Sequence, residues 1–291
     1  MERVENFYER ALDEIEAIPA ISSVVFKILQ ITASEFSSRG DLLRCLSSDQ
    51  TIAARVLQTI NSAYYGMSKP ISNLNVAVGL LGDKRIREIA LLCSSSGTIR
   101  QSYPGYGISA DNAWLHSVTT AFAAGFIAEK RYPEKSVSAF AAGLMHDIGK
   151  LVMDNLVRRF PGEMEAGEMA SEHAWDVLPG HHEMENEAFG FDHSQIGRTL
   201  ALKWNFPEEL ADAIGFHHNP DAAPSGGDLA HIASLADVIA HIHEMGIFDS
   251  NFLELLGEEG RIPFELSHEE IEDIFPKLGA EIRDLKTFLS H

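Results

Sequence analysis

One stretch in the middle of the chain, AFAAGLMHDIGKLVM from Ala139 to Met153, limits the possible folds more than any other. Almost every position is apolar or small, which predicts a helix buried on nearly all sides. Yet His146, Asp147 and Lys150 lie inside this run. Burying a charged group is strongly unfavourable unless it is paired or coordinates a metal. The fold must therefore compensate these three side chains.

Helical periodicity dominates the rest of the sequence, and no alternating strand pattern extends beyond about four residues. No internal repeat is present. The sequence therefore predicts an all-α protein. We expect helices over the following ranges: Ile18–Leu29, from Ser38 or Asp41 to Leu46, from a cap at Ser48 or Asp49 to about Tyr65, Leu74–Leu81, Arg85–Cys93, from a cap at Ser109 or Asp111 to about Lys130, Val137 to about Val157, His193–Trp204 after a cap at Asp192, Pro207–Asn219, and Asp228 to about His243. A glutamate-rich helix before Pro179 and two or three weaker helices in the last 45 residues are also expected.

The stretch GTIRQSYPGYGIS, residues 97–109, carries three glycines and a proline and is therefore predicted to be a loop. It is the best candidate for a boundary between lobes. We expect a smaller N-terminal helical lobe over 1–108, a second helical domain over 109–245 and a C-terminal helical appendix over 246–291.

Composition sets the class of protein. With 291 residues and 45% hydrophobic content, the chain can bury a large core. It shows no signal-peptide pattern and no apolar run of the roughly 18 residues that span a membrane. Cys45 and Cys93 match no metal or redox spacing. We therefore expect a soluble cytoplasmic protein that does not enter a membrane.

The formal net charge of -20 disfavours binding to nucleic acid, because phosphate contacts require Lys and Arg. The only basic cluster, Lys84, Arg85 and Arg87, is explained by a solvated helix face.

Imidazole and carboxylate groups recur on apolar helix faces. A single histidine in such a position is usually a hydrogen-bonded core residue, and His116 taken alone fits that description. Several helices that each contribute such a group are better explained by a metal site, and the mixture of ligands suits Zn, Mn, Fe or Ni. The candidates that this pattern indicates are His116, His146, Asp147, His193, His217 and Asp237.

The order of these residues resembles that of the HD superfamily of metal-dependent phosphohydrolases: His116, then His146 and Asp147 within HDIGK, then Asp237 within LADVIA. The segments IPAISSVVFKILQ, SSDQTIAARVLQTINSAYYG and AVGLLGDKRIREIAL, with HHNP further on, resemble the HDOD subgroup, which is associated with bacterial signalling. The resemblance extends from about Ile18 to Glu244.

This resemblance implies an HD-type helical domain with a smaller N-terminal lobe, and one or two divalent transition metal ions. It implies that one ion is held by His116, His146, Asp147 and Asp237. It further implies that a second ion shares Asp147 and uses His193, His217 and His218, and that Lys150 contacts the substrate phosphate.

The sequence departs from the related HD-GYP phosphodiesterases at two points. After His218 it reads NPDAAPSGGD, without the glutamate and Gly-Tyr-Pro element of those enzymes, so we do not expect efficient hydrolysis of cyclic di-GMP. Asn112 stands where their pattern has a glutamate, so we expect no third metal.

The remaining histidines and a group of glutamates are expected on the surface or in loops. The histidines are His173, His181, His182, His231, His241, His243, His268 and His291, and the glutamates are Glu183, Glu185 and Glu187.

Two functions stay open at this point. In the first, the protein is a metal-dependent phosphohydrolase or phosphodiesterase that acts on a small phosphoester or nucleotide, with Asp147 and Lys150 in the catalytic site. In the second, it is a catalytically inactive signalling module with a structural metal, whose N-terminal lobe binds a signalling partner.

Overall fold

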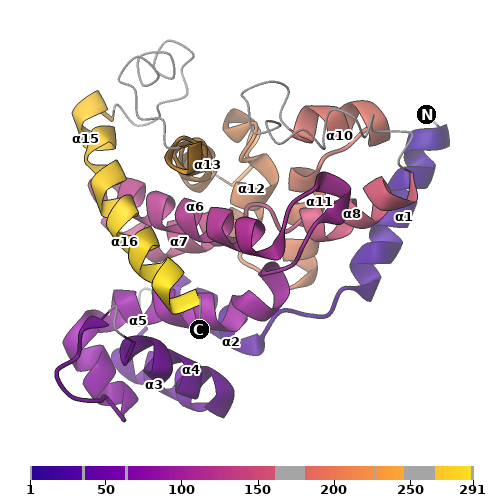
Figure 1. Ribbon diagram of the computed structural model, residues 1–291. Coiled ribbons are helices and arrows are strands. Elements are labelled where there is room, and N and C mark those ends of the chain that lie inside the picture. The colour runs from indigo at the N-terminus through magenta and orange to yellow at the C-terminus, as the bar shows by residue number, and fades with distance from the viewer. Residues whose placement is uncertain are drawn as a thin grey trace.

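The computed structural model describes residues 2–34, 37–62, 65–160, 181–225, 227–245 and 266–289. Within these ranges the regular elements are α-helices and short 3-10 helices, and no β-strand occurs, so the predicted all-α class is confirmed (Figure 1). The α-helices are α1 (Glu2–Ala17), α2 (Ser23–Ala33), α3 (Arg39–Ser47), α4 (Gln50–Ile60), α5 (Leu74–Ile99), α6 (Ala110–Arg131), α7 (Ser136–Met145), α8 (Lys150–Arg159), α10 (His181–Phe189), α11 (His193–Lys203), α12 (Glu208–Phe216), α13 (Asp228–Met245), α15 (His268–Glu272) and α16 (Ile274–Leu289).

Helix α6 is the centre of the larger part of the molecule. It begins after Ser109, whose hydroxyl accepts a hydrogen bond from the backbone N–H of Asn112. From Ala113 to Ala128 nearly all of its side chains are buried, as expected of a helix that is apolar on all sides. Helices α5, α7, α13 and α16 pack around it and together bury that surface.

The N-terminal lobe consists of α2 to α5, at the lower end of Figure 1. Its helices begin where the sequence supplies a capping side chain: Ser38 caps α3 and Asp49 caps α4. Helix α5 contains a kink at Gly82, whose φ of 79° favours glycine. The predicted break at this glycine is therefore confirmed, although the second segment continues to Ile99 rather than ending at Cys93.

Helix α1 was not expected from the sequence. It packs against α8 and α10, outside the N-terminal lobe. Its Phe7 makes edge-to-face contacts with Phe160 and Phe189, with ring centroids 5.1 and 5.3 Å apart. The division of the chain at residues 108 and 245 stays a prediction.

The expected single helix from Val137 to Val157 is wrong. Helix α7 ends at Met145, and α8 begins at Lys150, so His146 and Asp147 lie in the turn between them. Three-residue turns replace the α-helical hydrogen bonds here, with the N–H of Ile148 donating to Met145 O and that of Lys150 to Asp147 O. Gly149 is closely packed in this turn, because an added Cβ would lie 1.8 Å from the carbonyl oxygen of His193. The turn brings the backbone of this segment directly against α11.

The segments expected as the glutamate-rich helix before Pro179, together with His173 and His291, lie outside the described residues. At the C-terminal end, α16 packs against α6, and Glu281 pairs with Arg85 of α5 at 2.5 Å. None of the described helices has both the length and the apolar character needed to cross a lipid bilayer.

Gly143 is expected to be essential for the contact between α6 and α7. A Cβ there would lie 2.5 Å from the carbonyl oxygen of Thr120 and 2.9 Å from Cα of Ala121, and both atoms belong to helix backbone that cannot rotate away. Gly143→Ala should therefore lower the free energy of unfolding by about 1–3 kcal/mol, as measured by urea denaturation.

Gly79→Ala is the matched control for this substitution, because no atom of the described residues lies within 4 Å of an added Cβ on that exposed helical glycine. It should leave stability unchanged or raise it by up to about 1 kcal/mol. Equal stability of Gly143→Ala and the wild type would contradict the packing argument.

Candidate metal centre

The seven ligands implied by the sequence converge on one place, although they come from elements far apart in the chain. Helix α6 supplies one, the turn between α7 and α8 supplies two, α11 and the end of α12 supply three, and α13 supplies one. In that order they are His116, His146 and Asp147, His193, His217 and His218, and Asp237. Among the described residues there are three groups of three in which the ligand atoms lie within 4.8 Å of one another. Two of these groups share no residue, and the third, His146, Asp147 and His217, overlaps both.

The first set is His116, His146 and Asp237. The Nε2 atoms of His116 and His146 are 3.2 Å apart, and Oδ1 of Asp237 lies 3.0 Å from Nε2 of His116 and 3.5 Å from Nε2 of His146. Two ring nitrogens and a carboxylate oxygen thus face one common point, as ligands of a single ion do.

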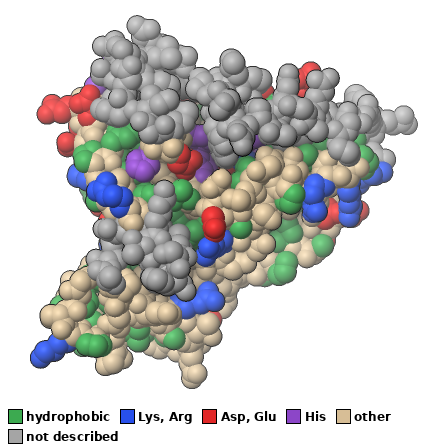
Figure 2. All heavy atoms as spheres, viewed as in Figure 1, with side chains coloured by type: hydrophobic (Ala, Val, Ile, Leu, Met, Phe, Trp, Pro, Cys, Tyr) green, Lys and Arg blue, Asp and Glu red, His purple; other side chains and the backbone are tan. Residues whose placement is uncertain are grey.

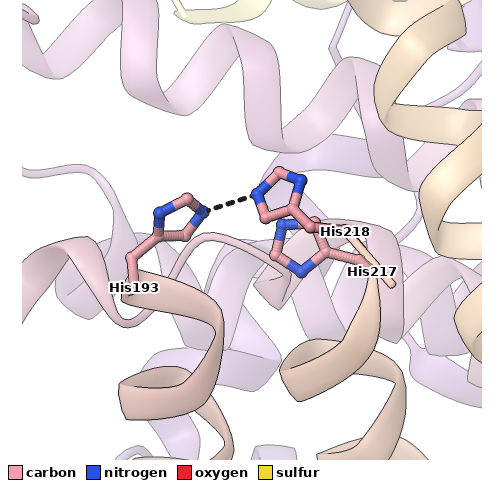
Figure 3. Close-up of side chains that lie close together, drawn as sticks. All are labelled: His193, His217 and His218. Atoms are coloured by element: carbon pink, nitrogen blue, oxygen red, sulfur yellow. Dashed lines mark hydrogen bonds between the residues drawn. The ribbon is translucent and has the colours of Figure 1, made fainter. Parts of the chain in front are cut away.

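The second set is His193, His217 and His218 (Figure 3). The Nε2 atoms of His193 and His218 are 3.1 Å apart. The ring of His217 lies 4.0 Å from that of His218 and 5.5 Å from that of His193, measured between centroids. His193 begins α11, whereas the other two follow the end of α12, so the packing of α11 on α12 brings the three rings together.

Asp147 lies between the two sets. Its Oδ1 is 3.2 Å from Nε2 of His193, and its Oδ2 is 3.5 Å from Nε2 of His146. One carboxylate therefore directs one oxygen to each set, which is the arrangement of a ligand shared by two ions.

Hydrogen bonds on the far side of the rings set their orientation. In four of the histidines Nδ1 donates to a carbonyl or carboxylate oxygen, which leaves Nε2 as the atom directed to the centre. The pairs are His116 with Glu244 at 3.2 Å, His146 with Gly143 O at 2.8 Å, His193 with Glu185 at 2.8 Å and His217 with Ile214 O at 2.7 Å.

The donor set fits a transition metal ion. Nε2 of His217 is buried and has no hydrogen-bond partner within the part of the chain that the structure describes, and a buried polar atom without a partner costs about 1–3 kcal/mol. A metal ion would provide the missing partner. Imidazole and carboxylate ligands together suit transition metals better than Mg or Ca.

Burial and neighbouring charges separate the pKa values of the histidines. Burial disfavours the charged ring of His116, but the carboxylates of Glu244 and Asp237 outweigh that effect and raise its pKa to about 10. The same balance, with Glu185 as the main carboxylate, raises the pKa of His193 to about 9. Burial, reinforced by the other histidines, lowers the pKa of His217 to about 3.

Lys150 is buried, and its ammonium lies 2.6 Å from Oδ2 of Asp147. Despite burial, this ammonium and the neighbouring imidazoles hold the pKa of Asp147 well below its ordinary value. Lys150 therefore keeps Asp147 ionised and lies at the edge of the centre.

Several residues expected on the surface belong to the centre, so that expectation is wrong for them. Glu185 is fully buried and contacts His193. His241 lies 3.1 Å from Asp237, and the ring of His182 stacks on His218 at 4.0 Å. The spacing of four between Asp237 and His241 could have indicated a shared helix face.

The centre keeps contact with the solvent. The imidazoles of His146, His193 and His217 are each 1% exposed, but the side chains of Asp147 and Asp237 are 14% exposed. Figure 2 shows histidine side chains that reach the surface on this face of the molecule, close to acidic side chains.

Comparison with known proteins places this geometry in context. A sequence-family model described as "HDOD domain" matches residues 18–220, which is well over half of the chain. An uncharacterized protein of Treponema pallidum (strain Nichols) is 25% identical over 216 residues. That alignment covers 73% of this chain but only 40% of the relative, so the chain spans less than half of that longer protein.

Two solved structures share the fold. An HDOD domain protein with unknown function from Geobacter sulfurreducens superposes with a TM-score of 0.74 at 23% identity, covering 96% of this chain and 97% of that one. A Shewanella amazonensis SB2B protein named "Putative phosphohydrolase" gives a TM-score of 0.72 at 22% identity, covering 94% and 96%.

Metal binding should release protons at neutral pH. His116 and His193 are protonated in the metal-free protein, because their pKa values lie at about 10 and about 9, and an imidazole must be neutral at Nε2 to bind an ion. Calorimetric titration with Mn in two buffers of different ionisation enthalpy should show this release. The apparent affinity should rise with pH until both rings are neutral, up to about pH 10.

The raised pKa values of His116 and His193 also make the stability of the metal-free protein depend on pH. Imidazoles whose pKa is raised on folding contribute stability that is fully present below about 6.5. That contribution is lost as the pH rises through about 9 and about 10.

For the calorimetric titration, a metal affinity that is independent of pH from 6.5 to 9 would contradict the assigned protonation states.

Proposed function

Since the chain belongs to the HDOD domain family, we propose that it is a signal-transduction protein that binds one or two divalent transition metal ions and hydrolyses a phosphoester at them. The observation that carries the proposal is the position of Asp147, whose two carboxylate oxygens face two separate sets of imidazoles.

In this proposal His116, His146, Asp147 and Asp237 hold one ion, and Asp147, His193, His217 and His218 hold the other. The support is the convergence of these side chains and the orientation of their Nε2 atoms toward common points. The ion is Fe, Mn, Ni or Zn, because these metals accept imidazole and carboxylate together.

Ions of this kind supply Lewis acidity toward a phosphoryl oxygen and activate water near neutral pH. The chain contributes orientation and charge. Asp147 holds its two oxygens toward the two sets of imidazoles, and the Lys150 ammonium balances its charge at 2.6 Å. Because that ammonium borders the centre, it also offers a positive charge to the phosphate of a bound substrate.

The proposed substrate is a small phosphoester or nucleotide other than cyclic di-GMP. The residues after His218 form a short turn, with 3-10 helix η4 over Pro220–Ala222. They lack the glutamate and Gly-Tyr-Pro element that accompanies dinucleotide hydrolysis in the related HD-GYP enzymes.

A second candidate function is a catalytically inactive signalling module in which the metal is structural and the N-terminal lobe binds a protein partner. The observation that favours it is the close pairing of Lys150 with Asp147, which leaves this ammonium engaged within the protein. Turnover experiments separate the two candidates.

Purified protein should carry one or two transition metal ions per chain. The double substitution His146→Ala, Asp147→Ala should abolish this content, because it removes ligands from both sets. It should also lower the midpoint of thermal unfolding, because an ion that binds only the folded state stabilises it. Elemental analysis and thermal denaturation measure the two effects.

The control is His268→Ala, which changes an exposed histidine in α15 and should leave metal content unchanged. Unchanged metal content in the double variant His146→Ala, Asp147→Ala would contradict the proposed metal centre.

With Mn or Fe supplied, the protein should hydrolyse at least one compound in a panel of mononucleotide and dinucleotide phosphoesters. Asp147→Ala should abolish turnover, and Lys150→Met should raise KM while leaving metal content nearly intact. Product release is measured by phosphate detection or chromatography. Turnover is expected to be slow for cyclic di-GMP, well below about 1 per second.

The outcomes of this assay decide between the candidates. No metal-dependent turnover across the panel would favour the inactive module, whereas rapid hydrolysis of cyclic di-GMP would contradict the substrate assignment.

A further inference from the structure

Glu185 of α10 is the most completely buried acidic side chain at the centre, with no exposed surface. Its Oε2 accepts two hydrogen bonds from one residue: the backbone N–H of His193 at 2.6 Å and the ring Nδ1 of His193 at 2.8 Å. The same oxygen therefore holds both the backbone and the ring of His193. A ring that is held at two points has little freedom to rotate.

The other oxygen of Glu185 is held by a residue from a distant part of the chain. The hydroxyl of Tyr106 donates a hydrogen bond to Oε1 of Glu185. Tyr106 is itself buried, at 2% exposure. Both oxygens of the carboxylate thus have partners, and a buried carboxylate needs such partners to remain ionised.

Tyr106 is fixed in turn by the loop that joins the N-terminal lobe to α6. It ends the 3-10 helix η2 (Pro104–Tyr106), which packs on α8. The backbone N–H of Gly105 donates to Oδ1 of Asp154 in α8 at 2.7 Å. A Cβ on Gly105 would lie 3.0 Å from Asp154 and Val157, so the loop lies directly against that helix.

We infer that Glu185 and Tyr106 are positioning residues for His193: Glu185 orients the imidazole so that Nε2 faces the ion shared with Asp147, and Tyr106 orients Glu185. The inference rests on the proposed metal centre. Its geometric support is that Nε2 of His193 lies 3.2 Å from Asp147 and 3.1 Å from His218, on the side of the ring opposite Glu185.

Glu185 acts through His193 and is not itself a ligand. Its Oε2 faces Nδ1 of the ring, whereas the proposed ion lies beyond Nε2. A carboxylate in this position fixes the tautomer and increases the basicity of the coordinating nitrogen. Among the described residues, the hydrogen bonds of Glu185 go to His193 and Tyr106. The first set, His116, His146 and Asp237, should therefore not depend on it.

The test is metal titration of the full chain with Co(II), with the affinity of each ion and the visible absorption spectrum as readouts. Glu185→Gln keeps the shape of the side chain but removes its charge. We expect it to lower the affinity for the ion at His193 by about 10- to 100-fold. Tyr106→Phe removes one hydroxyl, and we expect a smaller loss of about tenfold or less.

Three further variants complete the design. Glu187→Gln changes an exposed glutamate of the same helix and should bind cobalt as the wild type does. His193→Ala should remove the same spectral component that Glu185→Gln weakens. His116→Ala should remove the other one. A merely structural role of Glu185 would lower stability without this selective spectral change.

The outcomes separate this inference from the proposed function. If the wild type binds cobalt and both Glu185→Gln and Tyr106→Phe bind it with unchanged affinity and spectrum, the inference fails and the proposed centre stands. If Glu185→Gln does not fold, Tyr106→Phe alone decides. If the wild type binds one ion and His193→Ala abolishes that binding, both variants must bind the ion more weakly. A single ion whose binding does not require His193 overturns the inference. A wild type that binds no metal overturns the proposed function and this inference together.

Discussion

The structure around the centre depends on one largely buried carboxylate, that of Asp147. A carboxylate in this place is stable only when positive charge or a metal surrounds it. Here Lys150 lies 2.6 Å from one oxygen, and the imidazoles of His146 and His193 approach within 3.5 and 3.2 Å. Each of these groups must in turn be held, and the hydrogen bonds on their far sides do so.

Close backbone packing makes this arrangement possible. Gly143 lets α7 lie against the backbone of α6, and Gly149 lets the following turn touch the backbone of α11. A larger residue at position 143 would push the turn that carries His146 and Asp147 away from α6, which carries His116. A larger residue at position 149 would push the same turn away from α11, which carries His193. The small residues thus determine the geometry of the charged ones.

Polar contacts join the N-terminal lobe to the C-terminal helix, and the loop after that lobe to the centre. Tyr106, in the loop after α5, reaches Glu185 beneath His193. Arg85 of α5 pairs with both Glu88 and Glu281, and so ties the N-terminal lobe to α16 at the C-terminal end. Loss of the Tyr106–Glu185 contact would therefore alter the position of His193, and loss of the Arg85–Glu281 contact would loosen the packing of α16 on the N-terminal lobe.

The amino-acid sequence by itself determined the helical class and the ligand candidates, and it offered Ser38, Asp49 and Asp192 among the possible caps, because periodicity and capping are local properties. Only the tertiary structure showed that the helix breaks after Met145 and that the turn there packs on α11 at Gly149, because a contact with α11 is not local. It also decided the place of Glu185. Residues two apart on a helix differ by about 200°, so Glu183, Glu185 and Glu187 could not all share a solvated face. Which of them is buried depends on α11 and Tyr106, which lie elsewhere in the sequence.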